Sequence, residues 1–207
     1  MEFFSKTDLD ILKLVSLFKK GQVVAGPTET AYGLLADATN QAALKKIFYI
    51  KGRPAHKPCP VVVATLAMAK KWADFDSLSL KLAQAFWPGP LTLVLPTQQS
   101  FWPARLLAGQ AEIGLRLTSS SWLRKLSGSL GRPVTATSAN LSGQPVLYDY
   151  KEVAKQLAPN NLKYLVASRR LPIRPVSTVV RVRKGHLRVL RRGAISLARI
   201  EDVIRYK

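Results

Sequence analysis

Apolar residues recur at two different spacings along the chain of 207 residues. The helical spacing between residues 11 and 18 predicts a helix that ends at Gly21, with Thr7 and Asp10 forming a capping box at its start. Similar patterns predict further helices near residues 40–50, 77–86, 121–130 and 149–157.

Short continuous apolar runs lie between these helices and predict buried strands at residues 22–25, 61–64, 91–95, 113–117, 134–137 and 176–182. Lys184, Gly185 and His186 predict a hairpin turn into a further strand at 187–190. Strands that alternate with helices are typical of an α/β fold, here with mixed strand directions. Because no repeat or linker interrupts the pattern, we expect one domain over residues 1–207.

Charge sets this chain apart from an average globular protein. It has 32 Lys and Arg against 12 acidic residues, a net charge of +20. Residues 163–207 hold 13 of these cations and two acids, which is +11 for this segment alone. Such an excess favours polyanionic substrates or partners, although a basic solvated surface would look the same.

Several classes of protein are excluded at this stage. The single cysteine, Cys59, rules out an internal disulfide framework and multi-cysteine metal sites, and it fits a reducing compartment. The first ten residues do not have the pattern of a signal peptide. The uncharged run 58–69 is shorter than the roughly 20 residues of a membrane span. We therefore expect a soluble, cytoplasmic protein without membrane contact.

Familiar catalytic motifs are also missing. The two histidines, His56 and His186, do not form part of a zinc-binding or hydrolase motif. Residues 21–28 match the glycine spacing of a phosphate loop, but Pro27 stands where that loop needs lysine. We therefore expect no protein metal ligands and no classical nucleotide-binding loop.

Three loops that follow predicted elements are rich in polar groups. Residues 27–34 (PTETAYGL) have hydroxyls that suit ligand binding or helix capping. Residues 51–58 (KGRPAHKP) have three cations, which suit a triphosphate or complement a helix C-terminus. Residues 135–143 (TATSANLSG) suit either a nucleotide or a plain turn.

One charged residue interrupts an apolar strand. Arg116 lies within the run IGLRL, and a buried charge of this kind needs a partner. A substrate carboxylate is one candidate. The hydroxyls of Ser177 and Thr178 and the cations Arg191 and Arg192 follow later in the chain.

In this order, seven segments resemble the YrdC/Sua5 family: PTETAYGL, KGRPAHKP, WPGPLTLVLP, IGLRL, TSANLSGQP, VSTVV and VLRRGAI. They run from about residue 23 to 195. The resemblance implies an open, twisted mixed sheet flanked by helices, with a concave basic cleft. It is to the short bacterial type, so we expect no C-terminal domain of the longer Sua5 type.

The resemblance also implies an activity. Family members form threonylcarbamoyl-adenylate and pyrophosphate from L-threonine, bicarbonate and ATP, with Mg2+ accompanying ATP. The product serves a downstream tRNA threonylcarbamoyltransferase complex. By the same resemblance Lys51 and Arg53 are catalytic, and Thr30, Arg116 and Ser177 bind threonine. Residues implied in ATP binding are Arg53, Lys57, Ser138, Asn140 and Arg191.

Three positions depart from the family pattern. Glu29 stands where Asp is commoner, Thr118 where proline is usual, and Arg181 where an acid is typical. Arg181 adds positive charge beside the expected threonine pocket, so the binding geometry there could differ from that of the family.

Two other functions stay open. One is a non-catalytic RNA-binding or ribosome-maturation protein that uses the basic face, although its basic segment has only Tyr164 and Tyr206 for stacking on bases. The other is an enzyme that makes plain carbamoyl-adenylate.

Overall fold

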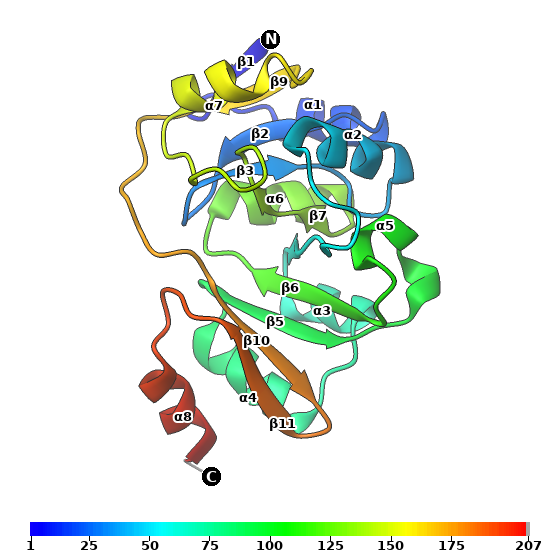
Figure 1. Cartoon of the computed structure of the whole chain (residues 1–207), viewed down its shortest axis with the longest axis vertical. Coiled ribbons are helices and arrows are strands. Elements are labelled where there is room, and N and C mark those ends of the chain that lie inside the picture. Colours follow the sequence, from blue (N-terminus) through cyan, green and yellow to red (C-terminus); the bar gives the residue numbers. More distant parts are fainter. Residues whose placement is uncertain (206–207) are drawn as a thin grey trace.

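The computed structural model describes residues 1–205 and contains two mixed sheets, one above the other along the long axis of the molecule (Figure 1). The upper sheet has the order β1 (Glu2–Ser5), β9 (Tyr164–Ala167), β2 (Val24–Pro27), β3 (Tyr32–Leu35) and β8 (Thr137–Ser138). The lower sheet has the order β11 (His186–Arg191), β10 (Thr178–Arg183), β5 (Leu91–Pro96), β6 (Glu112–Leu117), β4 (Val61–Val63) and β7 (Val134–Thr135). The predicted α/β fold with mixed strands is confirmed, although the strands form two sheets.

The helices are α1 (Ile11–Lys19), α2 (Gln41–Lys51), α3 (Leu66–Trp72), α4 (Ser77–Phe86), α5 (Ala104–Leu107), α6 (Ser121–Leu130), α7 (Tyr150–Leu157) and α8 (Leu197–Arg205), with a 3-10 turn at Gln99–Phe101. The five predicted helices are confirmed, and α4 and α6 match their predicted bounds. Helices α3, α5 and α8 and strands β1, β3 and β9 were not predicted. The single strand predicted at 134–137 is two short strands, β7 and β8, which belong to different sheets. Within residues 1–205, no helix has the length and apolar character needed to cross a membrane.

Helix ends fix the segments that lead to the site. Asp10 caps α1 alone, because its carboxylate accepts from the N–H groups of Leu12 and Lys13 at 2.8 and 3.1 Å. The predicted capping box with Thr7 is therefore wrong. Helix α2 begins at the capping residue Asn40 and ends at Gly52, which adopts φ 59°. This left-handed backbone conformation is favourable for glycine, and it ends the helix directly after Lys51.

The predicted hairpin is confirmed. Strands β10 and β11 pair antiparallel, and Arg183 lies opposite His186 across the turn. Lys184 and Gly185 between them have φ values of 51° and 73°, as a two-residue turn with left-handed backbone requires.

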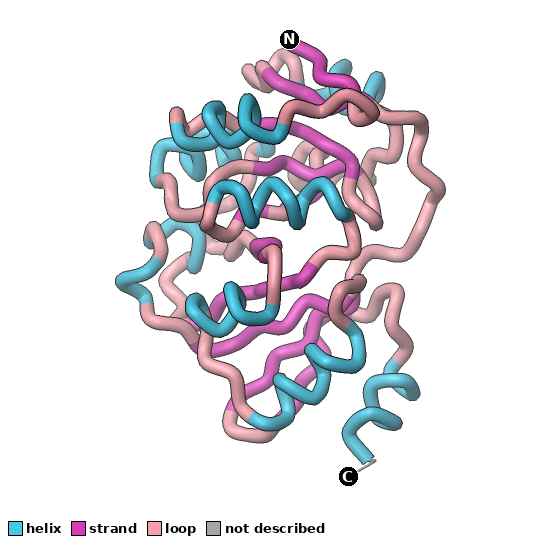
Figure 2. Tube along the Cα trace, turned by 180° about the vertical axis from the view of Figure 1, so that it is seen from behind, coloured by secondary structure: helices cyan, strands magenta, loops and turns pink. Residues whose placement is uncertain are grey.

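Figure 2 shows the molecule from behind. On this side, helices cover the strands of both sheets. Helices α3 and α4 pack against the lower sheet, and α8 packs on α4. Helices α1 and α6 pack against each other over a second apolar cluster that includes Trp122. The indole of Trp122 donates to the main-chain oxygen of Pro27 at 3.0 Å and so fixes the end of β2.

Candidate functional site

A cavity of about 360 Å³ lies between the two sheets. The upper sheet contributes the loop between β2 and β3 and strand β8, and the lower sheet contributes β5, β6, β10 and β11. Among the described residues, four arginines and one carboxylate, that of Glu112, line the cavity. The cleft is therefore basic, as the resemblance implies, and it suits an anionic ligand. The four arginines are Arg53, Arg116, Arg181 and Arg191.

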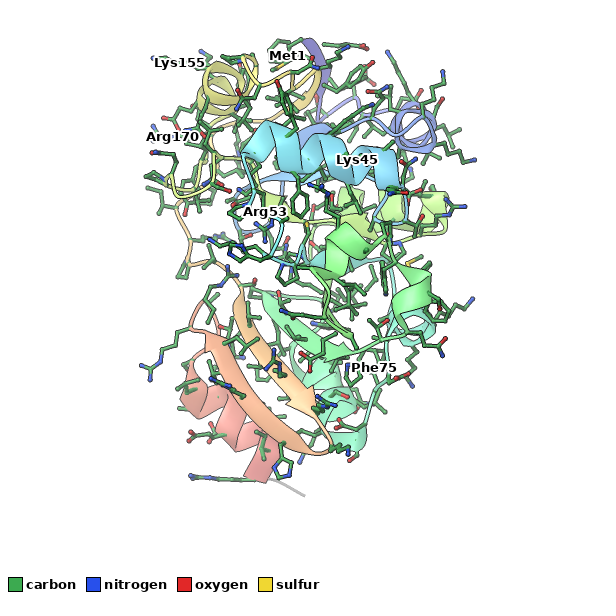
Figure 3. All side chains as sticks on the ribbon, turned by 45° about the vertical axis from the view of Figure 1, so that its right-hand side comes forward. Met1, Lys45, Arg53, Phe75, Lys155 and Arg170 are labelled. Atoms are coloured by element: carbon green, nitrogen blue, oxygen red, sulfur yellow. The ribbon has the colours of Figure 1, made fainter. Side chains whose placement is uncertain are left out.

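The loop after α2 folds around the guanidinium of Arg53. Its Nη2 donates to the main-chain oxygen of Pro58 at 2.6 Å, and its Nε donates to that of Lys57 at 3.2 Å. A weaker contact of 3.4 Å joins Nη1 to the hydroxyl of Thr137. Arg53 lies below α2, towards the middle of the molecule, whereas Lys155 and Arg170 lie at its outer edge (Figure 3). Lys57 is exposed and does not line the cavity.

The side chain of Lys51 is buried away from this cavity. Its ammonium group donates to the main-chain oxygen and hydroxyl of Ser138, at 2.7 and 3.2 Å. It also donates to the main-chain oxygen and Oδ1 of Asn140, both at 2.9 Å. Burial lowers the pKa of Lys51 to about 8, and the charge of Arg53 adds to the shift. Lys51 thus ties the end of α2 to the loop after β8.

Asn140 also has its polar atoms in use within the loop. Its Nδ2 donates to the main-chain oxygens of Leu141 and Gln144 at 3.0 and 2.6 Å, while its Oδ1 accepts from Lys51. Asn140 is buried and is not among the residues that line the cavity. Ser138, two residues earlier, does line it. Lys51 and Asn140 therefore shape the loop that presents Ser138.

At the other end of the cavity, Arg191 is tied to Ser177. The Nε and Nη2 of Arg191 donate to the main-chain oxygen of Ser177 at 3.1 and 2.8 Å, and Nη2 also reaches the hydroxyl at 2.9 Å. That hydroxyl lies 3.0 Å from the hydroxyl of Thr92 on β5. Two strands and the segment before β10 thus hold one cationic, hydroxyl-rich corner.

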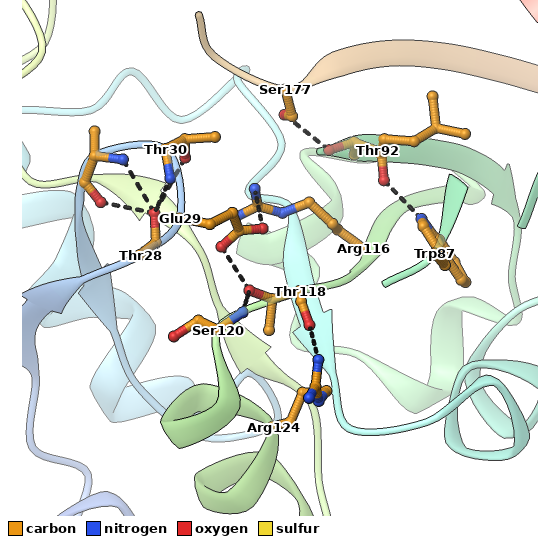
Figure 4. Close-up of polar contacts among 12 residues, drawn as sticks. Thr28, Glu29, Thr30, Trp87, Thr92, Arg116, Thr118, Ser120, Arg124 and Ser177 are labelled. Atoms are coloured by element: carbon orange, nitrogen blue, oxygen red, sulfur yellow. Dashed lines mark hydrogen bonds and ion pairs between the residues drawn. The ribbon is translucent and has the colours of Figure 1, made fainter. Parts of the chain in front are cut away.

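Arg116 on β6 has a carboxylate of this chain as its partner. Its Nη1 lies 3.0 Å from Oε1 of Glu29, and the two side chains are 7% and 11% exposed (Figure 4). Burial lowers the pKa of Arg116, and the charge of Glu29 opposes that shift. An arginine stays protonated at neutral pH. Arg116 therefore lines the cavity as a cation that is paired with one carboxylate.

Arg181 forms the second ion pair at the cavity. Its Nε lies 2.8 Å from Oε2 of Glu112 on β6, across the intervening strand β5. The side chain of Glu112 is 12% exposed and that of Arg181 is 33% exposed. The carboxylate of Glu112 thus balances the positive charge that Arg181 adds beside the cavity.

Two side chains on the cavity lining, Cys59 and Tyr32, could in principle act as nucleophiles. Burial raises the pKa of the Cys59 thiol to about 11 and that of the Tyr32 phenol to about 12. Both groups are therefore neutral near pH 7 and weak as nucleophiles. Among the described residues, no group of three or more His, Cys, Asp and Glu side chains is placed to bind a metal ion.

The structure brings together six of the residues that the resemblance implicated, namely Thr30, Arg53, Arg116, Ser138, Ser177 and Arg191. It does not place Lys51, Lys57 or Asn140 on the cavity lining. Sequence reasoning missed Thr92 and Gln110, which also line it. Thr92 has a local signal, since it is the one polar residue in the apolar run LTLVL. Gln110 lies in a loop without such a signal.

Comparison with known proteins gives the family. A family model described as "Telomere recombination" (Sua5_yciO_yrdC) matches residues 16–193. A threonylcarbamoyl-AMP synthase of Pyrococcus abyssi is 35% identical over 187 residues, which is 90% of this chain and 54% of that protein. The chain thus spans about half the length of that relative. One from Psychromonas ingrahamii is 32% identical over 84% of this chain and 89% of its own length.

The fold has a counterpart among solved structures. The crystal structure of P. abyssi Sua5 complexed with L-threonine superposes with a TM-score of 0.90 and 32% identity, over 98% of this chain and 60% of that one. The TM-score shows that the fold is shared with that structure. The chain therefore belongs to the Sua5/YciO/YrdC family.

Proposed function

We propose that the protein is a threonylcarbamoyl-AMP synthase, which converts L-threonine, bicarbonate and ATP into threonylcarbamoyl-AMP and pyrophosphate. The observation that carries the proposal is a cavity lined by four guanidinium groups and several hydroxyls, which suits an anionic nucleotide and an amino-acid carboxylate. In this reaction the attacking group comes from the substrate, because the threonine amine condenses with bicarbonate, with loss of water, to give a carbamate. A carbamate oxygen then attacks the α-phosphate and pyrophosphate leaves.

Such a reaction needs positioning and charge neutralisation more than covalent catalysis. Arg53 is the proposed catalytic contact at the phosphates, and Lys57 is an additional phosphate contact from the same loop. Ser138 and Arg191 would bind the nucleotide from opposite sides of the cavity. Lys51 and Asn140 would act on ATP through the loop that presents Ser138, because their polar atoms already contact each other.

The amino-acid substrate is assigned to the Arg116 end of the cavity. Arg116 would receive the threonine carboxylate, with Thr30 and Ser177 as hydroxyl partners on either side. The related P. abyssi Sua5 was crystallised with L-threonine, which supports this substrate class. The fork of N–H donors on the Arg116 guanidinium suits a planar carboxylate.

Magnesium enters the proposal as part of the substrate MgATP rather than as a resident metal. A single domain over 1–207, a cytoplasmic location and transfer of the product to a tRNA threonylcarbamoyltransferase complex complete the proposed role. The product class is a reactive mixed anhydride, so a transferase must consume it.

The test is pyrophosphate release by the purified protein from MgATP, with and without L-threonine and bicarbonate. Release that needs both supports the synthase. Release that does not need threonine points to a different acceptor, as in carbamoyl-adenylate formation. Arg53→Ala should lower the rate about 30- to 1000-fold, since a lost donor at a reacting phosphate costs roughly 2–4 kcal/mol.

A second candidate function is direct RNA binding. It rests on the exposed arginines Arg169, Arg170 and Arg174 in the segment between β9 and β10. Tyr206, one of the two aromatics considered for stacking, lies outside the described residues. RNA affinity that falls steeply with salt, without threonine-dependent pyrophosphate release, would favour this function over the synthase.

A further inference from the structure

The two carboxylate oxygens of Glu29 have different partners. Oε1 lies 3.0 Å from Nη1 of Arg116, and Oε2 lies 2.6 Å from the hydroxyl of Thr118 (Figure 4). An ionised carboxylate only accepts hydrogen bonds, so Thr118 is the donor. A bond to a charged acceptor at this length is strong. Glu29 therefore connects a hydroxyl on one side to a guanidinium on the other.

Thr118 is well fixed for this task. The residue is completely buried, and its hydroxyl oxygen accepts from the main-chain N–H of Ser120 at 3.1 Å. The main-chain oxygen of Thr118 accepts from Nη1 of Arg124 on α6 at 3.1 Å. Because Ser120 is the N-cap residue of α6, Thr118 is anchored to the start of that helix. Its one hydroxyl hydrogen is left for Glu29.

Arg116 is the group that benefits from a fixed Glu29. Its guanidinium is planar and has several N–H donors in a rigid arrangement. Glu29 contacts it through Nη1. This contact is an ion pair without hydrogen-bond geometry, so it holds the guanidinium charge near Glu29 without fixing the plane of the group. A shift of Glu29 would therefore move the guanidinium and its remaining donors relative to the cavity.

We propose that Thr118 and Glu29 are positioning residues that orient Arg116 for the carboxylate of the amino-acid substrate. The proposal rests on the proposed function for the identity of that substrate. Neither residue is assigned a contact with threonine or ATP. Loss of the Thr118 hydroxyl would leave Glu29 free to shift, and Arg116 would then bind a carboxylate less well. Binding of the nucleotide, which is assigned to other residues, would change little.

The experiment compares Thr118→Val, which removes the hydroxyl with little change in shape, with Thr118→Ser, which keeps it. Calorimetry gives the Kd for L-threonine, and initial rates give KM for threonine and for ATP. We expect Thr118→Val to raise the Kd and KM for threonine about tenfold, or ~1.4 kcal/mol. KM for ATP should stay within about twofold, and Thr118→Ser should match the wild type within about twofold.

A matched control separates positioning from general loosening. Thr97 also has a buried hydroxyl, which donates to the main-chain oxygen of Trp72 at 2.6 Å, and it contacts neither Glu29 nor Arg116. Thr97→Val should reduce stability but leave the Kd for threonine unchanged. If Thr118→Val does not fold, Glu29→Gln takes its place, because it keeps the shape and removes the charge. It should show the same selective rise for threonine.

The Kd for L-threonine tests the positioning role separately from the synthase activity, because it is measured without catalysis. A wild-type protein that binds threonine but releases no pyrophosphate would overturn the synthase activity, while the ratio of threonine Kd values would still support the positioning role. Equal Kd values for the wild type and Thr118→Val would overturn the positioning role even in an active synthase. A wild-type protein that binds no threonine would overturn both.

Discussion

The ammonium group of Lys51 donates to two oxygens of Asn140, the side-chain Oδ1 and the main-chain oxygen, both at 2.9 Å. Two oxygens of Ser138 complete its surroundings. With three hydrogens shared among four acceptors, the group has nothing left to offer a phosphate. Lys51 therefore stabilises the loop that contains Ser138 and Asn140, and its removal should affect the stability of the protein.

We expect Lys51→Met to lower the free energy of unfolding by about 3 kcal/mol, because buried acceptors lose their donor. Urea unfolding measures this loss. Lys45→Met is the control, since Lys45 is an exposed residue of the same helix, and it should change stability by less than about 0.5 kcal/mol. A Lys51→Met protein of full stability and no activity would instead indicate direct catalysis.

The lowered pKa of Lys51, about 8 against its ordinary 10.5, predicts a pH-dependent stability. Between these values the unfolded chain binds the proton and the folded chain does not, so the free energy of unfolding rises with pH. From pH 7 to 9.5 the advantage of the wild type over Lys51→Met should grow by about 2 kcal/mol. Urea titrations of both proteins at pH 7 and 9.5 measure it. A constant difference would place the pKa of Lys51 near its ordinary value.

Arg191 contacts Ser177 through two nitrogens, a geometry that lysine cannot reproduce. Arg191→Lys should therefore raise KM for ATP about tenfold, or ~1.4 kcal/mol. The measurement is the initial rate of pyrophosphate release at varied ATP. Arg192→Lys changes an exposed neighbour in the same way and should leave KM for ATP unaltered. Equal effects of the two variants would contradict a specific role for Arg191.

The pair of Arg181 and Glu112 can be tested by a double-mutant cycle. Arg181→Met alone leaves the largely buried Glu112 carboxylate without its ion-pair partner and should destabilise the protein by about 1–3 kcal/mol. Addition of Glu112→Gln should restore most of that loss. A coupling energy near zero, from urea unfolding of all four proteins, would show that the two side chains act independently.

Local pattern predicted those elements whose signals lie within one segment. Helix α4 has its N-cap Asp76 and its apolar spacing side by side in the sequence, so its bounds were predicted well. Strand β3 was missed because only the four residues from Thr28 to Ala31 separate it from β2. The Thr28 hydroxyl closes that turn through bonds to Thr30 and Ala31, and neither Gly nor Asn marks it.

The site was predictable by residue type more than by side-chain direction. The three cations of residues 51–58 suggested a phosphate site. Their spacing does not reveal that Lys51 points into the loop after β8 while Arg53 lines the cavity. Contacts between distant segments were out of reach for a different reason. Thr118 and Glu29 are 89 residues apart, and no local pattern joins them.

Residues 134–138 belong to both sheets, because β7 pairs in the lower sheet and β8 in the upper one, with Ala136 between them. Ala136 also lines the cavity. The segment thus connects the two sheets directly at the wall of the cavity. Under the proposed assignment, a substrate that contacts Thr30 of the upper sheet's loop and Arg116 of the lower sheet would form a second connection between the sheets beside this one.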